Sequence, residues 1–283
     1  MDNLPLIIVL GLVFSVSLAA SKFSENTYKV YTAEEQRISA MQDAETAKPA
    51  EKKSTFFNNY NINELKNNYH KPNKIGAKTI IDVPIINQFP ELPTGCEIAS
   101  STALLNYLGI KIDKVTLQEN YFEDSYNFRY NENNERIGPD PNEVFVGDPK
   151  DTGFGCLSPV VEKSLDNYFK TNSYNYDAIQ LEDATQKDLE TLLDNGIPVI
   201  VWASRNMSPF KYTPNNDWIL ETTGKKFTWP GNSHVLVLIG YDENDYYFSD
   251  CDNKNDIAFY RKADFILRWE QFNSQGIIVQ MKN

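Results

Sequence analysis

The sequence is poor in cysteine, in histidine and in positive charge. Its 283 residues include three Cys, two His and 27 Lys and Arg against 39 Asp and Glu, so that the net charge is −12. Three cysteines cannot build a disulfide-rich scaffold, and a chain of this length can bury a core without one. Two histidines argue against a His-rich metal site, and we expect neither metal nor cofactor. Too few basic residues are left to cluster on phosphates, which argues against a nucleic-acid partner.

The amino terminus carries an apolar segment. Residues 4–20 read LPLIIVLGLVFSVSLAA, without a charge and with small residues at the end. This pattern resembles an export signal, although an ordinary signal begins with Lys or Arg and the only charge before Lys22 is Asp2. The length also reaches the lower limit for a membrane span. We therefore expect residues 1–20 to be a signal peptide or a membrane anchor, and the protein to be secreted or anchored on the outer side of a membrane.

A polar segment follows, from residue 21 to residue 77. It lacks the apolar density of a core and is typical of a flexible tether or leader. An inhibitory propeptide is the alternative, in which Phe56, Phe57 and Tyr60 would dock on the rest of the chain. A globular domain, expected to be monomeric, is predicted for residues 78–283.

The pattern of the domain predicts helices mostly first and strands mostly last. The expected elements are a strand at 79–86, helices at 96–108 and 158–169, a helix from Thr185, strands at 197–203, 234–240 and 246–250, a helix at 262–272 and a strand at 276–281. Thr94 and Ser158 are the expected N-caps of the first two helices, and a further short helix is expected after Thr116. The Asn-, Asp- and Gly-rich residues 121–155 are too many for a plain connector. This order indicates an α+β fold with segregated layers.

Cys96 and His234 are candidates for a nucleophile and its base. Cys96 is placed in the first turn of a helix, and His234 begins an apolar strand directly after the turn-like run WPGNS. A helix amino terminus and a nearby imidazolium both lower the pKa of a thiol, which makes the sulfur a better nucleophile. Taken alone, each residue is more often a plain core residue.

A base of this kind needs an orienting acid, and the reaction needs an oxyanion donor. Asp250 ends the next predicted strand and is the first choice for the acid, with Asp242 and Asp252 as rivals. Gln88, upstream of Cys96, is a candidate amide donor beside the backbone N–H of Cys96. Each is also a common surface or turn residue.

The combination resembles a known family. The runs DVPIINQFPELPTGCEIASSTALLNYLGI, GDPKDTGFGCLSPVVEKSLDNYF, LDNGIPVIVWAS and SHVLVLIGYDENDYYFSDCDN resemble the bacterial papain-like cysteine peptidases of the family thirty-nine-like group, relatives of bacteriocin-processing double-glycine-leader peptidases. The resemblance covers residues 79 to 283 approximately, and PTGCE is its most specific motif. It implies a papain-like α+β fold in which the nucleophile helix packs on an antiparallel sheet, and a peptide or protein substrate.

The same resemblance implies the roles of four residues. Cys96 corresponds to the nucleophile, His234 to the base, Asp250 to the orienting acid and Gln88 to the oxyanion amide. Two departures stand out: Cys251 follows Asp250 where the family has Pro, and residues 207–228 form a long insertion before His234.

The alternatives to an exported cysteine peptidase are a noncatalytic surface-binding module on the same scaffold and an acyl or peptidyl transferase. In an oxidising compartment Cys156 and Cys251 are candidates for a disulfide, with two unpaired thiols as the other possibility.

Overall fold

A computed structural model describes residues 54–65, 69–75, 78–252 and 256–282. These residues all fall in one compact unit, Lys53–Asn283. Residues 1–53 lie outside the described residues. The predicted signal or anchor therefore lies outside them as well. Within the described ranges, no helix is long and apolar enough to cross a membrane.

The unit is built on an eight-stranded sheet whose pairs are all antiparallel. Its main path runs β1 (Asn73–Ile75), β2 (Lys78–Ile80), β12 (Ser233–Tyr241), β9 (Val199–Ser204), β15 (Gly276–Met281) and β8 (Tyr176–Gln180), and β13 (Asp245–Ser249) joins β12 to β14 (Ala258–Arg261). The central strand β12 is buried along nearly its whole length, from His234 to Gly240. Residues 235–239 of this strand are all apolar, and a strand buried in this way is continuously apolar rather than alternating.

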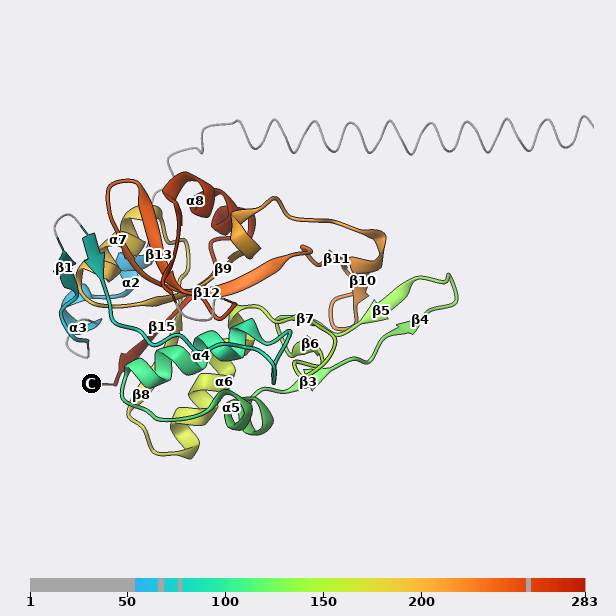
Figure 1. Ribbon diagram of the computed structural model, residues 1–283. Helices are drawn as coiled ribbons and strands as arrows, with labels where there is room; N and C mark the ends of the chain where they lie inside the picture. Colours follow the sequence, from blue (N-terminus) through green and yellow to red (C-terminus); the bar gives the residue numbers. More distant parts are fainter. Residues whose placement is uncertain (1–53, 66–68, 76–77, 253–255, 283) are drawn as a thin grey trace, which may run out of the picture. The chain divides into compact units, whose positions relative to one another are not determined.

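Seven α-helices lie in the described residues. They are α2 (Phe56–Asn59), α3 (Ile62–Leu65), α4 (Cys96–Tyr107), α5 (Lys114–Tyr121), α6 (Ser158–Thr171), α7 (Gln186–Asp194) and α8 (Lys262–Gln271). Two 3₁₀ turns, at Arg205–Met207 and Pro214–Asn216, follow β9. Helix α4 packs on β12 and α6 on β8, while α8 packs on β9. Figure 1 shows α4, α5 and α6 on one side of the sheet and α8 on the other.

The predicted nucleophile helix is confirmed, but two predicted caps are wrong. Helix α4 begins at Cys96 with Gly95 as its N-cap, and the Thr94 hydroxyl donates instead to the carbonyl of Asp148, at 3.0 Å. Helix α6 begins at Ser158, so its N-cap is Leu157. In both cases a tertiary partner takes the hydroxyl that local sequence rules assign to the cap.

The strand predicted at 79–86 is mostly wrong, because β2 ends at Ile80. Pro84 lacks an N–H for a sheet ladder, and the chain around it follows an irregular path toward the site. The helix expected after Thr116 begins earlier, at Lys114, where the Asp113 carboxylate accepts from the amides of Val115 and Thr116.

Two small sheets form beside the large one. The first has the order β11 (Lys226–Thr228), β10 (Asp217–Leu220), β5 (Arg136–Gly138), β4 (Arg129–Tyr130), and the second has the order β3 (Asp124–Ser125), β6 (Phe145–Gly147), β7 (Gly153–Gly155). Strand β10 pairs in parallel with β5, with Ile219 opposite Ile137. The long insertion before His234 is therefore fastened to the Asn- and Gly-rich segment after Tyr121.

Part of the predicted leader belongs to the folded unit. Phe56 and Leu65 are both 1% exposed, and β1 pairs with β2. The boundary expected at residue 78 thus falls inside the unit, because these apolar side chains complete its core.

The leader also contacts the far end of the nucleophile helix. Tyr69 stacks on Tyr107 at the last turn of α4, which is a 12-residue helix. The Tyr107 end of the helix lies about 16 Å from the end that carries Cys96.

Candidate active site

Cys96 is the first residue of α4 and is half-buried. At this position its backbone N–H has no acceptor within the helix and is available to a ligand. One turn later the Ser100 hydroxyl donates to the carbonyl of Val235, at 3.1 Å. This bond holds the amino-terminal end of α4 against the start of β12, where His234 lies.

A cleft of about 360 Å³ opens at this end of the helix. Its lining includes Gln88, Cys96, Gly153, Phe154, Trp229 and Asn232. Arg205 and Asn216 also line it, so the segment between β9 and β12 supplies part of the wall. A larger hollow of about 500 Å³ lies around β4, β5, β10 and β11, but it is lined by none of the four predicted site residues. The position of Cys96 therefore favours the smaller cleft as the reaction site.

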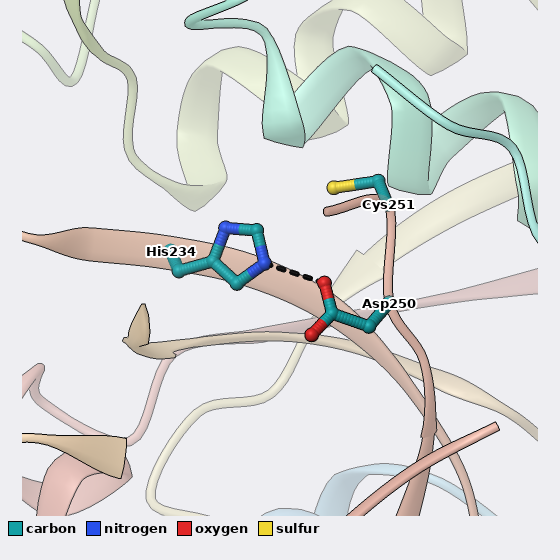
Figure 2. A group of neighbouring side chains, drawn as sticks. All are labelled: His234, Asp250 and Cys251. Carbon is teal, nitrogen blue, oxygen red and sulfur yellow. Dashed lines mark hydrogen bonds and ion pairs between the residues drawn. The ribbon is translucent and has the colours of Figure 1, made fainter. Parts of the chain in front are cut away.

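His234 and Asp250 form a buried pair. The ring Nε2 of His234 lies 2.7 Å from Oδ1 of Asp250, and the two residues are 1% and 4% exposed. Figure 2 shows the carboxylate reaching the ring from the loop that follows β13. Burial alone would raise the pKa of Asp250, but the hydrogen bond and charge of His234 lower it overall. An ionised Asp250 accepts a hydrogen bond from Nε2–H, so in the neutral tautomer of the ring Nδ1 is the nitrogen without a proton.

Nδ1 of His234 is buried and has no hydrogen-bond partner among the described residues. Buried polar atoms are nearly always paired, so an unpartnered ring nitrogen calls for a functional explanation. His234 itself is not among the residues that line the cleft, although its neighbour Ser233 is.

Of the three candidate acids, Asp250 is the one in contact with His234. The carboxylate of Asp252 pairs with Arg205, at 3.0 Å, and its backbone amide donates to Asp250. Asp242 caps the turn between β12 and β13, where it accepts from Asn244 N. Asp250 is thus the acid that lies against His234, and its role as the orienting acid stays a prediction.

Glu97 is a site residue that the sequence reasoning missed. It is 2% exposed; its Oε1 accepts from the amide of Cys156 at 2.9 Å, and its Oε2 accepts from the thiol of Cys96 at 3.3 Å. Gly155, with φ of +125°, leaves space for it, since a Cβ there would lie 2.3 Å from Oε1. Burial raises the pKa of Glu97 to about 7. Its position inside the PTGCE motif was the available signal.

The expectation of a lowered pKa for Cys96 is wrong for this arrangement. Burial raises the pKa of the thiol well above its usual value, and the neighbouring carboxylate of Glu97 raises it further. A hydrogen bond with the backbone of Val235 acts in the opposite direction but is the smaller effect. The raised pKa favours the thiol over the thiolate, and the thiol donates its hydrogen bond to Glu97.

Gln88 lines the cleft as expected, although it is only 1% exposed. Its Nε2 donates to the carbonyl of Pro93 at 2.7 Å, and its Oε1 accepts from the thiol of Cys251 at 3.2 Å. An amide nitrogen carries two protons, so the bond to Pro93 leaves one of them unused.

The remaining cysteines, Cys156 and Cys251, are both unpaired and buried, which is the second of the two alternatives considered for them.

Cys251 also belongs to a group of side chains that could be metal ligands. Its sulfur, a ring nitrogen of His234 and a carboxylate oxygen of Asp250 lie within 4.8 Å of one another. Zn²⁺ uses such ligands. Here, however, Nε2 and Oδ1 are already bonded to each other at 2.7 Å, which is too close for both to be ligands of one tetrahedral ion. The cluster is better explained by hydrogen bonding than by a metal.

Three comparisons with known proteins give a family, a relative and a solved structure that are similar to this chain. The model of the Peptidase_C39 like family matches residues 80–277. The uncharacterized protein YvpB of Bacillus subtilis (strain 168) is 27% identical over 215 residues, which are 72% of this chain and 77% of YvpB. A crystal structure of a candidate C39-like peptidase from Bacillus anthracis is 28% identical, covers 72% of this chain and 98% of its own, and has a TM-score of 0.59. The papain-like α+β fold predicted from the sequence is confirmed by these likenesses.

Proposed function

Because the chain belongs to the Peptidase_C39 like family, we propose that it is a cysteine peptidase in which Cys96 is the nucleophile and His234 the base. The observation that carries this proposal is the state of His234. Its Nε2 is held by Asp250 at 2.7 Å, and its buried Nδ1 has no partner among the described residues. One ring nitrogen is held by a carboxylate and the other is left to accept a proton, an arrangement that suits proton transfer from a thiol.

The reaction begins with a change of partner for the thiol. Sγ of Cys96 turns from Glu97 toward His234 by rotation about the Cα–Cβ bond, and its proton passes to Nδ1. The thiolate then attacks the carbonyl carbon of a peptide bond. The backbone N–H of Cys96 and the second N–H of Gln88 Nε2, the one that does not donate to Pro93, stabilise the oxyanion.

The second half of the reaction returns the proton. The C–N bond breaks as Nδ1–H of His234 protonates the leaving amine, and an acyl group stays on the sulfur. Water attacks this thioester with His234 again as base, the carboxylic acid leaves, and the thiol is restored. Asp250 stabilises the imidazolium that forms in each half.

We propose a peptide or protein substrate met outside the cell, with the protein acting as a monomer. The support for export is the uncharged run at residues 4–20, either as a cleaved signal or as an anchor. A preference for double-glycine leaders is not carried over from the bacteriocin-processing relatives to this chain.

Labelling with iodoacetamide tests the nucleophile and base. The wild-type protein should be alkylated at Cys96, as located by peptide mass mapping, and the label should be lost in Cys96→Ala and strongly reduced in His234→Ala. Cys156→Ala, which removes another buried thiol, is the matched control and should label normally. Undiminished labelling of Cys96 in His234→Ala would instead favour a noncatalytic binding module.

A further inference from the structure

The residue after the orienting acid, Cys251, is tied to Gln88 at two points. The backbone amide of Gln88 donates to the carbonyl of Cys251 at 2.9 Å, and the thiol of Cys251 donates to Oε1 of Gln88 at 3.2 Å. The two residues are 163 positions apart in the sequence. The contact therefore joins the loop before α4 to the loop after β13.

The hydrogen bonds fix which way the amide of Gln88 faces. The carbonyl of Pro93 can only accept, so the atom 2.7 Å from it must be the nitrogen of the amide. Oε1 then faces Cys251, whose thiol is the one donor to this oxygen among the described residues. Because Gln88 is 1% exposed, water does not readily replace that donor.

The thiol of Cys251 is suited to remain a donor. It is 2% exposed, and the carbonyls of Cys96 and Val235, at 3.8 and 3.6 Å, are further acceptors within its reach. The hydroxyl of Ser100 also lies beside the thiol, and its hydrogen bond lowers the pKa of Cys251 less than burial and Asp250 raise it. Burial and then the carboxylate of Asp250 raise the pKa of this thiol, which keeps it protonated. Three acceptors compete for one proton, and Oε1 of Gln88 is the nearest.

We propose that Cys251 is a positioning residue for the oxyanion: by holding Oε1 of Gln88, it keeps the second proton of Nε2 directed into the cleft beside Cys96. This inference rests on the proposed function. Asp250 and Cys251, adjacent on one loop (Figure 2), then support the two halves of the site, since Asp250 orients the base and Cys251 orients the oxyanion donor.

Two reactions of Cys96 separate this role from a merely structural one. Acylation by p-nitrophenyl acetate passes through an oxyanion: the thiolate adds to the ester carbonyl, the C–O bond breaks and p-nitrophenolate leaves. Alkylation by iodoacetamide displaces iodide at a saturated carbon and forms no oxyanion. Loss of an oxyanion donor slows carbonyl chemistry about 100-fold or more, and a misdirected donor should cost about tenfold.

The experiment measures both rates in wild type, Cys251→Ala, Cys251→Ser and Gln88→Ala, with Cys156→Ala as the control. Cys251→Ala should acylate about tenfold more slowly and alkylate at the wild-type rate, whereas Cys251→Ser, whose hydroxyl can donate to Oε1, should recover acylation. The double variant Cys251→Ala/Gln88→Ala should be no slower than Gln88→Ala alone.

Two results would overturn the proposal while leaving the proposed function intact. They are equal acylation by wild type and Cys251→Ala, and an equal fall of both rates in Cys251→Ala, which would indicate a structural defect. If Cys96 of the wild type is neither acylated nor alkylated, the proposed function fails and the role of Cys251 fails with it.

Discussion

The thiol of Cys96 donates a hydrogen bond to the carboxylate of Glu97, with Sγ 3.3 Å from Oε2. The nucleophile thus rests against its neighbour in the sequence, while Nδ1 of His234 stays without a hydrogen-bond partner in the described part of the chain. Glu97 is in turn held by the amide of Cys156. The contact with Glu97 lowers the reactivity of Cys96, because a carboxylate beside a thiol disfavours the thiolate.

Replacing Glu97 with Gln should make Cys96 more reactive. The amide can still accept from Cys156 N but carries no charge, so the pKa of the thiol falls and more thiolate is present at neutral pH. The rate of alkylation of Cys96 at pH 7 should rise by about tenfold, and its pH profile should move to lower pH. Glu91→Gln is the control, since that carboxylate is exposed and paired with Lys114 at 2.7 Å. An unchanged profile in Glu97→Gln would contradict the role of Glu97.

The pH dependence of the protein's stability should also reflect the buried carboxyl group of Glu97. Burial raises the pKa of this acid from 4.5 to about 7 in the folded state. The unfolded chain therefore ionises first, and stability is lost as pH rises from the unfolded pKa through 7. Between pH 5 and pH 8, the free energy of unfolding of wild type should fall by about 2 kcal/mol relative to that of Glu97→Gln. Urea unfolding of both proteins across this range measures the difference, and parallel curves would speak against a perturbed Glu97.

The choice of acid can be tested by a matched pair of substitutions. Asp250→Ala removes the partner of His234 Nε2, so the imidazole loses its orientation and the rate of acylation by p-nitrophenyl acetate should fall about 100-fold. Asp252→Ala removes a carboxylate that pairs with Arg205, and the rate should stay within about twofold of wild type. Equal effects of the two substitutions would remove the distinction between these acids.

The buried part of the leader makes a prediction about folding. Phe56 is 1% exposed in the core, whereas the neighbouring Phe57 is half-buried. Phe56→Ala should lower the free energy of unfolding by about 3 kcal/mol, and Phe57→Ala by clearly less. Chemical denaturation of the two variants provides the measurement. A Phe56→Ala protein as stable as wild type would show that residues 54–65 are not part of the cooperative unit.

The sequence was sufficient for the parts of the site that depend on local patterns. Ile98, Leu104, Leu105 and Leu108 have helical spacing, so Cys96 could be placed in the first turn of this helix. The apolar run of β12 located His234, and a strand followed by a turn brought Asp250 to the same edge. The same reasoning named Gln88 as a candidate amide donor, and the family resemblance implies the same roles for all four residues.

The parts that the sequence did not predict depend on long-range contacts. The strands after Tyr121 pair with residues such as Ile219, far along the chain, and their Asn- and Gly-rich composition carries no strand pattern. The burial of Glu97 depends on the space at Gly155, and the bond between Cys251 and Gln88 depends on the meeting of two loops. Side-chain partners of this kind are set by tertiary packing rather than by periodicity.

The most direct test of peptidase activity is digestion of a mixed peptide library by wild type, Cys96→Ala and His234→Ala proteins, with the products sequenced by mass spectrometry. Wild type should generate new amino and carboxyl termini at a reproducible subset of bonds, and both variants should generate none above the uncatalysed background. A library left intact by folded wild-type protein, or cut equally well by Cys96→Ala, would contradict the assignment of a cysteine peptidase.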